Sequence, residues 1–168
     1  MAEEEVIIRP LSESDSLEEL TELLHRAYRV LADLNLRYMA THQDVNVTRD
    51  RIKNGRCFVA EMDGQVVGTI TYYEPGHSKG SPWLERPEIA HIGQMGVAPE
   101  LQGRGIGTRL MNYTERVARG DGAVELALDT AEPATHLIKW YERLGYRFIE
   151  HTTWDVTNYR SVIMSKKL

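Results

Sequence analysis

The chain has 168 residues, 42% of them hydrophobic and 27% charged; this composition is typical of a globular protein, and we expect a single domain over residues 1–168. A net charge of −5 argues against nucleic-acid binding, and no apolar run approaches the ~18 residues of a membrane span. The acidic start of the chain lacks the basic and apolar regions of a signal peptide, and the lone Cys57 leaves no internal disulfide. We therefore expect a cytoplasmic protein without membrane or nucleic-acid partners.

The first half of the chain predicts two helices and three strands. Ser16 and Glu19 form a capping box before a helix whose apolar residues recur at helical spacing as far as Leu34. Asp63-Gly64 is a strong hairpin signal between two apolar runs. The expected elements are a strand at 6–10, a helix at 16–34, a short helix at 47–54 with Gly55 as its C′ residue, and strands at 57–62 and 66–73.

The second half begins with a proline- and glycine-rich segment, residues 74–88, which predicts a long loop. The next strand contains Gly93 and Gly96, which we interpret as positions where a ligand approaches the backbone rather than as a bulge. The expected elements are strands at 89–97, 124–129, 146–149 and 161–164, a helix at 105–120, and a helix around 137–144 closed by Gly145.

This order of elements predicts an α/β (α+β) fold. An antiparallel hairpin early in the chain and a strand–helix–strand crossover later require a mixed sheet. We expect a central sheet of about seven strands, mostly antiparallel, with helices on both faces.

A glycine-rich turn lies between the strand at 89–97 and the following helix. Unpaired N–H groups and the dipole at a helix start attract anions, and glycines let a phosphate approach the backbone. The spacing of Gly103, Gly105 and Gly107 does not fit a dinucleotide fingerprint, and the Lys-Ser/Thr of a P-loop is absent. The turn therefore predicts a different phosphate site; a tight turn without a ligand is the plain alternative.

Two motifs resemble those of the GNAT superfamily of acyl-CoA-dependent N-acyltransferases. The first is Gln102-Gly103-Arg104-Gly105-Ile106-Gly107, which matches that family's Gln/Arg-x-x-Gly-x-Gly/Ala signature. The second is the segment 137–146, a tyrosine-bearing helix followed by Gly-Tyr. The order of elements matches as well, so the resemblance covers essentially the whole chain.

The resemblance implies that acetyl-CoA lies where the fourth and fifth strands splay apart. Its pantetheine arm would pair with the backbone of Met95 and Val97, and its pyrophosphate would lie on the amides of residues 102–108. Many members carry an asparagine at the position of Ala134, so His136 or Thr135 would take over that contact. The implied cofactor-binding residues are Met95, Val97, Ala98, Gln102, Gly103, Arg104, Gly105, Ile106, Gly107, Thr108 and His136.

Tyr141 stands where the family often has the acid that protonates the departing coenzyme A thiolate. The alternative is a core residue, because Tyr141 falls on the apolar stripe of its helix. Full proton transfer from a tyrosine to a thiolate is uphill by ~2 kcal/mol in water, so hydrogen bonding to the thiolate is the more important contribution.

His91 occupies the strand position at which one branch of the family carries a glutamate base. Strand alternation places it on one face with Gly93, Met95 and Val97. Proton transfer to an imidazole costs ~5 kcal/mol from a lysine-like ammonium and ~2 kcal/mol from an α-ammonium, so a histidine base favours a less basic amine. A structural histidine is the alternative.

Other candidates carry less weight. Asp129 at a strand end could face the cleft or cap the next turn. The six histidines and single cysteine lack the spacing of metal ligands, so we expect no metal, and Cys57 has no base nearby in sequence to make it a nucleophile.

We therefore predict an N-acetyltransferase that transfers acetyl from acetyl-CoA to an amine of a small molecule or peptide by direct attack. The alternative is a non-catalytic acyl-CoA-binding regulatory module. Residues 35–45 and 74–88 are expected to shape the acceptor site, with Tyr38, His42, Tyr73 and Trp83 as its aromatic residues. The acceptor itself is left open, as is assembly into a homodimer.

Overall fold

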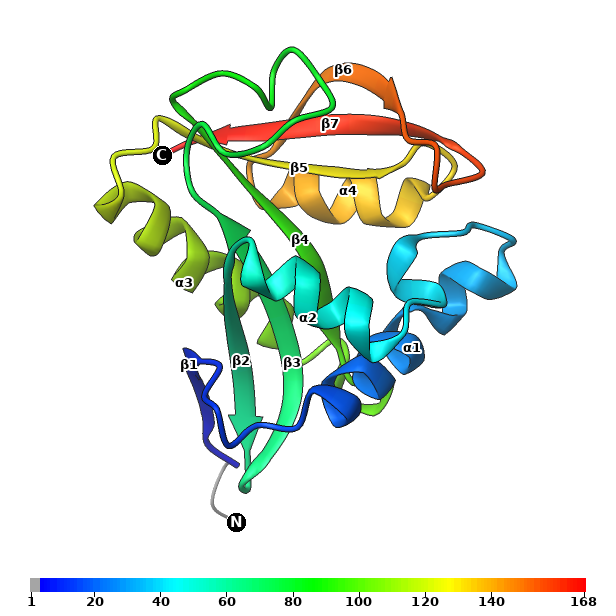
Figure 1. Cartoon of the computed structure of the whole chain (residues 1–168), viewed down its shortest axis with the longest axis vertical. Coiled ribbons are helices and arrows are strands. Elements are labelled where there is room, and N and C mark those ends of the chain that lie inside the picture. Colours follow the sequence, from blue (N-terminus) through cyan, green and yellow to red (C-terminus); the bar gives the residue numbers. More distant parts are fainter. Residues whose placement is uncertain (1–3) are drawn as a thin grey trace.

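The computed structural model describes residues 4–168, which form one seven-stranded sheet with helices on both faces (Figure 1). The strands are β1 (Val6–Pro10), β2 (Arg56–Met62), β3 (Gln65–Tyr73), β4 (Ile89–Val97), β5 (Glu125–Ala131), β6 (Arg147–Thr153) and β7 (Arg160–Lys167). The helices are α1 (Leu17–Asp33), α2 (Val45–Lys53), α3 (Ile106–Gly120) and α4 (Thr135–Arg143), with single 3-10 turns η1 (Met39–Thr41) and η2 (Pro99–Leu101).

The strand order is β1-β2-β3-β4-β5-β7-β6, and every neighbouring pair is antiparallel except β4 and β5. The expected mixed, mostly antiparallel sheet is thereby confirmed. Helices α1 and α2 cover one face, and α3 and α4 the other (Figure 1). On each face a glycine lets a helix pack closely on the sheet. A Cβ on Gly96 would lie 2.9 Å from Ala27 of α1, and a Cβ on Gly68 would lie 3.1 Å from Leu110 of α3.

Local signals in the sequence determine several element ends. The Ser16 hydroxyl accepts the N–H of Glu19 at 3.2 Å, as a capping box requires. Asp63 and Gly64 both have positive φ, which is the geometry of a two-residue hairpin turn. Gly145 has φ 100°, and the N–H groups of Gly145 and Tyr146 donate to Glu142 and Tyr141, so α4 ends in a Schellman motif.

Other ends differ from the prediction. Helix α2 begins at Val45 rather than at 47, because the Asp44 side chain caps it by accepting the N–H of Val47 at 2.9 Å. Gly55 follows the helix without positive φ; it is needed there because a Cβ would lie 2.5 Å from the carbonyl oxygen of Tyr72. Strands β6 and β7 run longer than predicted, because their polar ends pair with each other out to Thr153 and Arg160.

A bulge in β4 corrects the predicted alternation of its side chains. Thr71 pairs with Gly93 and Thr69 with Gly96, so β4 has one extra residue there, and Gln94 takes φ 49°. His91 and Gly93 therefore lie on the face of α1 and α2, whereas Met95 lies toward α3 and α4. The prediction that His91, Gly93, Met95 and Val97 share one face is wrong, since period two does not survive a bulge. The interpretation of Gly93 and Gly96 that set a bulge aside is wrong as well, because the extra residue lies between them.

The parallel strands β4 and β5 pair over only three residues, ending at His91 and Ala127. Beyond that pair β4 continues to Val97 and β5 continues to Ala131 without pairing to each other. The expected splay between the fourth and fifth strands is therefore present.

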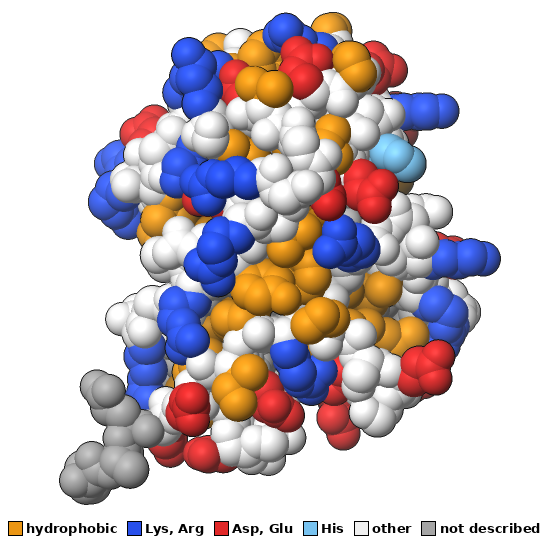
Figure 2. Space-filling model, turned by 90° about the vertical axis from the view of Figure 1, so that its left-hand side faces the viewer, with side chains coloured by type: hydrophobic (Ala, Val, Ile, Leu, Met, Phe, Trp, Pro, Cys, Tyr) orange, Lys and Arg blue, Asp and Glu red, His pale blue; other side chains and the backbone are white. Residues whose placement is uncertain are grey.

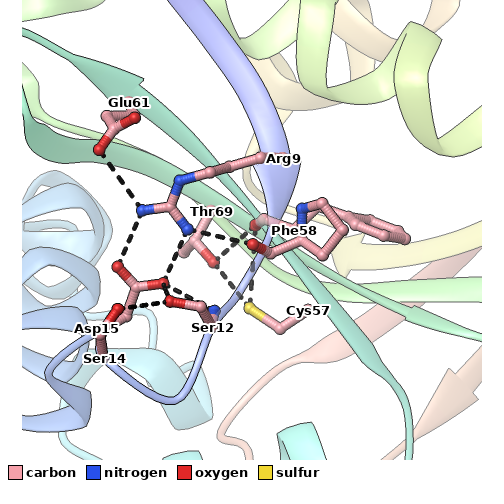
Figure 3. Close-up of polar contacts among 9 residues, drawn as sticks. Arg9, Ser12, Ser14, Asp15, Cys57, Phe58, Glu61 and Thr69 are labelled. Atoms are coloured by element: carbon pink, nitrogen blue, oxygen red, sulfur yellow. Dashed lines mark hydrogen bonds and ion pairs between the residues drawn. The ribbon is translucent and has the colours of Figure 1, made fainter.

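A polar cluster ties β1 to the start of α1 (Figure 3). Arg9 donates to both carboxylate oxygens of Asp15, at 2.8 and 2.9 Å, and its guanidinium lies 3.6 Å from Glu61 of β2. This bidentate pair holds the pKa of Asp15 well below its usual range. The cluster joins edge strand β1 both to its neighbour and to the chain that leads into α1.

Figure 2 shows the side of the molecule that carries β1 and α3, where Lys and Arg side chains stand around and between hydrophobic ones. The guanidinium of Arg56 lies 5.7 Å from the ring centroids of both Phe58 and Tyr72, and that of Arg116 lies 5.8 Å from Tyr113. At these distances the guanidinium groups make cation–π contacts with the aromatic rings. No helix among residues 4–168 is long and apolar enough to cross a membrane.

Candidate active site

A cavity of about 1300 Å³ occupies the splay between β4 and β5. Its wall comes from β4 and β5, from α1 and α2, from the turn before α3, and from α4 and the chain after β6. Pockets for drug-sized ligands have volumes of ~300–1,000 Å³, so this one has room for an elongated ligand and a second small molecule.

The glycine-rich turn forms one end of the cavity. Gly103 and Gly105 have φ of 80° and 81°, a backbone conformation that side chains strongly disfavour. The N–H groups of residues 103–108 have no backbone acceptor within residues 4–168 and lie at the start of α3. The turn therefore presents a row of free donors at a helix N-terminus, which suits an anion.

Gly107 has a different role from the other two glycines. A Cβ there would lie 3.3 Å from Met95 and from the ring of Trp140. Its missing side chain lets α3 pack closely on β4 and α4. The side chain of Gln102 donates to the carbonyl oxygen of Val97 at 3.2 Å and fixes the turn against the end of β4.

Most of the predicted cofactor-binding residues line the cavity. Ala98 and Arg104 do not: Ala98 is buried and donates its N–H to Val67 at 2.8 Å, and Arg104 is exposed. Gly93 and Gly96 line it too, but their space is also filled by protein, since a Cβ on them would meet Arg51 and Ala27. The predicted residues that line the cavity are Met95, Val97, Gln102, Gly103, Gly105, Ile106, Gly107, Thr108 and His136.

Tyr141 reaches the cavity from α4. Its side chain is 8% exposed and packs against Trp140, with ring centroids 4.9 Å apart. Burial raises the pKa of Tyr141 well above its usual range, and no hydrogen bond satisfies its hydroxyl within residues 4–168. Tyr141 is thus both a packed residue and a free, protonated hydrogen-bond donor at the cavity wall.

His91 lies at the vertex of the splay and contacts three side chains. Its Nε2 is 3.3 Å from Oδ1 of Asp129, its Nδ1 is 3.3 Å from the hydroxyl of Ser78, and its ring stacks on Tyr73. The other oxygen of Asp129 accepts the indole N–H of Trp154 at 3.1 Å. Asp129 therefore faces the cleft and does not cap the following turn.

A carboxylate only accepts hydrogen bonds, so the pairing with Asp129 places the proton of a neutral His91 on Nε2. Nδ1 then carries the lone pair, on the side of Ser78. This arrangement gives the cavity one oriented basic nitrogen beside one carboxylate.

Ala134, the position at which the resemblance implies an asparagine, is fully buried against Leu31 and Ala131. It contributes nothing to the cavity wall. Of the two substitutes expected, His136 lines the cavity and Thr135 does not.

The predicted acceptor segments contribute in part. Tyr38 and Tyr73 line the cavity, whereas His42 and Trp83 do not. The hydroxyl of Tyr38 forms a hydrogen bond with the hydroxyl of Thr130 and accepts one from the N–H of Ala131, both at 2.9 Å. These bonds tie the segment at residues 35–45 to the end of β5. The lining residues that the sequence did not indicate include Tyr28, Arg51, Trp154 and Tyr159, because none of these belongs to a motif.

Cys57 lies outside this cavity. Its thiol is buried 3.2 Å from the hydroxyl of Thr69, and burial raises its pKa (Figure 3). Within residues 4–168 no group of three or more His, Cys, Asp or Glu side chains is arranged to hold a metal ion.

The model of the acetyltransferase (GNAT) family matches residues 17–146. The chain is 34% identical over 131 residues to the S-(2-succino)cysteine N-acetyltransferase of Bacillus subtilis (strain 168), covering 77% of each protein. It is 27% identical over 139 residues to the S-alkylcysteine N-acetyltransferase of the same organism, covering 81% of this chain and 76% of that protein.

Among solved structures, the fold is similar to that of a GNAT family acetyltransferase from Elizabethkingia anophelis, which was crystallised with acetyl-CoA bound. The TM-score is 0.69 with 16% identity, over 97% of this chain and 98% of the other. At that identity the likeness concerns the fold, and it agrees with the expected architecture.

Proposed function

Because the chain belongs to the acetyltransferase (GNAT) family and is an N-acetyltransferase, we propose that it transfers acetyl from acetyl-CoA to the α-amine of a small S-substituted cysteine. The amine attacks directly, with both substrates held together, so much of the rate gain comes from positioning. We further propose that residues 1–168 act as one catalytic domain, because all seven strands belong to one sheet.

The observation that carries this proposal is the convergence of three features on one cavity. The free N–H groups of the glycine-rich turn, the hydroxyl of Tyr141, and the His91–Asp129 pair all border it. An anion site, a hydrogen-bond donor and an oriented base are the groups that acetyl transfer from a thioester to an amine requires.

The chain fits acetyl-CoA at the turn and along β4. The donors at residues 103–108 would hold its pyrophosphate, and the edge of β4 beyond His91 has no strand neighbour on its β5 side. When bound there, acetyl-CoA supplies an activated acetyl group at the vertex of the splay. The backbone of Met95 and Val97 would pair with the pantetheine arm, and an amide of one of them would stabilise the developing oxyanion.

His91 acts as the base in this proposal. Its Nδ1 accepts the proton of the acceptor ammonium, directly or through a water, while Asp129 stabilises the imidazolium that forms. An α-amine suits this pair better than a lysine-like amine, because an α-ammonium gives up its proton more readily.

Tyr141 acts on the leaving group. Its raised pKa makes it a poor proton donor and keeps it protonated, so it assists the coenzyme A thiolate by donating a hydrogen bond. Trp140 holds the ring in place from the neighbouring position.

The acceptor class follows from the two curated relatives, which are named for S-(2-succino)cysteine and S-alkylcysteine. Both substrates share a cysteine amine next to a carboxylate and differ in the group on sulfur. The aromatic wall of the cavity, with Tyr38, Trp154 and Tyr159, suits a variable sulfur substituent.

An acceptor panel tests the proposal through thiol release from acetyl-CoA. The panel contains S-(2-succino)cysteine, an S-alkylcysteine, unmodified amino acids, a polyamine and an N-terminal peptide. We expect turnover with the two S-substituted cysteines at kcat/KM at least tenfold above the rest. Binding of acetyl-CoA without turnover of any amine would instead favour an acyl-CoA-binding module.

A further inference from the structure

Arg51 is an arginine of the cavity wall that lacks an acidic partner. It projects from α2, is half-buried, and lines the cavity. No carboxylate within residues 4–168 forms an ion pair with it, in contrast to Arg9, Arg56 and Arg147, each of which is paired with an aspartate or glutamate. A half-buried guanidinium without a counter-charge is a feature that needs a physical reason.

The guanidinium is nevertheless held in place. Its Nη1 donates to Oε1 of Gln43 at 2.9 Å. Gln43 is buried, and its amide nitrogen donates to Thr48 at 2.8 Å and to Gln94, the bulge residue of β4. A packed polar network thus fixes one edge of the guanidinium. The guanidinium also lies beside the Tyr73 side chain, where its charge opposes the rise that burial gives to the pKa of that phenol.

The Nη2 edge of the guanidinium lies over β4. An ideal Cβ on Gly93 would stand 3.2 Å from Nη2 of Arg51, so the absence of a side chain at that position makes room for the guanidinium. His91 lies on the same face of β4, two residues before Gly93, and the bulge comes after Gly93. At ~3.3 Å per residue, strand positions 91 and 93 are separated by about 7 Å along β4.

We propose that Arg51 binds the α-carboxylate of an amino-acid acceptor and so directs its amine to His91, an inference that rests on the proposed function. The carboxylate of the acceptor would be hydrogen-bonded to Arg51 and its amine to His91, each at about 2.9 Å. Together with the short N–Cα–C span of an α-amino acid, these two bonds are long enough to bridge the distance between strand positions 91 and 93. A guanidinium fork binds a carboxylate through two parallel hydrogen bonds, which fixes its orientation as well as its position.

The experiment compares two acceptors that differ only in the carboxylate. S-propylcysteine and its decarboxylated analogue, S-propylcysteamine, are assayed with acetyl-CoA using the wild-type chain, Arg51→Gln and Arg51→Lys. Arg49→Gln is the matched control, because Arg49 is exposed on the same helix, donates to Asn46, and does not line the cavity.

We expect Arg51→Gln to lower kcat/KM for S-propylcysteine by about 100-fold, to change that for S-propylcysteamine by less than about threefold, and to leave the KM of acetyl-CoA unchanged. Arg51→Lys should recover part of the loss, since it restores the charge without the fork. An equal loss on both acceptors in Arg51→Gln, or no preference for the carboxylate in the wild-type chain, overturns the assignment.

Calorimetric binding of S-propylcysteine separates this inference from the proposed function. If the wild-type chain binds S-propylcysteine and Arg51→Gln does not, the carboxylate site is supported. If that binding occurs without turnover, the proposed function is wrong but the carboxylate site still stands. Absence of binding by the wild-type chain overturns the role of Arg51.

Discussion

His91 and Asp129 join the two strands of the splay at the point where they part. Nε2 of His91 lies 3.3 Å from Oδ1 of Asp129, and His91 belongs to the last backbone pair between β4 and β5. Trp154 holds the other carboxylate oxygen through its indole N–H at 3.1 Å. The contact with Asp129 that orients the imidazole of His91 thus lies at the vertex of the cleft.

The first prediction concerns this pair. His91→Ala removes the proposed base and should lower kcat by about 100-fold, within the range of general base catalysis. Asp129→Asn keeps the shape but loses the charge that stabilises an imidazolium, and should lower kcat by about tenfold. Because Asp129 acts through His91, the double variant should be no slower than His91→Ala alone.

Steady-state kinetics of the three variants, with a saturating S-substituted cysteine, check this expectation. The KM of acetyl-CoA serves as the control for an intact cavity. If the double variant lost about 1,000-fold in kcat, the product of the two single losses, the two residues would act independently. That result would contradict the proposal that Asp129 acts through His91.

Much of the fold follows from the sequence because its signals are local. The capping residue Ser16, the Asp63-Gly64 turn and Gly145 after α4 each fix backbone geometry within a few residues, and the structure bears them out. The glycine-rich turn is local in the same sense, since two of its glycines are required by their own positive φ.

Long-range geometry could not be predicted in the same way. The bulge at Gln94 depends on contacts with Gln43 and Thr71, which come from other elements, and it overturns the alternation expected for β4. Arg51 enters the cavity because α2 packs over Gly93, and nothing in residues 47–54 indicates that placement. The orientation of Asp129, left open by the sequence, depends on Trp154 far along the chain.

The second prediction concerns Tyr141→Phe. Loss of the hydroxyl removes the hydrogen bond proposed for the departing thiolate, while the ring keeps its packing against Trp140. We expect kcat to fall about 10- to 100-fold with little change in the binding of acetyl-CoA, measured by titration calorimetry. The raised pKa of Tyr141 also means that wild-type activity should show no loss from its ionisation between pH 8 and about pH 10.

An unchanged kcat in Tyr141→Phe would remove the hydroxyl from the mechanism and leave Tyr141 as a packing residue. Tyr113→Phe is a suitable control, since Tyr113 belongs to α3 and lies outside the main cavity.

The third prediction tests the phosphate site through Gly105→Ala. Residue 105 has φ 81° and nothing within 4 Å of an ideal Cβ, so alanine would be strained by its backbone rather than by a clash. A left-handed alanine costs ~1–2 kcal/mol, and relief of that strain would turn the free N–H groups away from a ligand. We expect acetyl-CoA to bind about 10-fold more weakly.

Gly120→Ala supplies the matched control in the same helix. Gly120 also has open space around an ideal Cβ but lacks positive φ, so alanine should be neutral or stabilising by ~0.5–1 kcal/mol. Equal affinity for acetyl-CoA in Gly105→Ala and Gly120→Ala would show that the turn does not hold the phosphates.

The fourth prediction concerns stability and its dependence on pH. In Asp15→Asn the bidentate pair with Arg9 is lost, and because both side chains are partly exposed we expect a loss of ~1–2 kcal/mol in the free energy of unfolding at pH 7. The folded pKa of Asp15 is depressed, so its contribution is fully present above the unfolded value near ~3.9 and declines as pH falls toward the folded value. Urea unfolding at pH 7, 5 and 3 should show a constant difference between the two proteins at the first two values and a smaller one at pH 3. A difference that stays constant down to pH 3 would show that the carboxylate charge of Asp15 does not stabilise the fold.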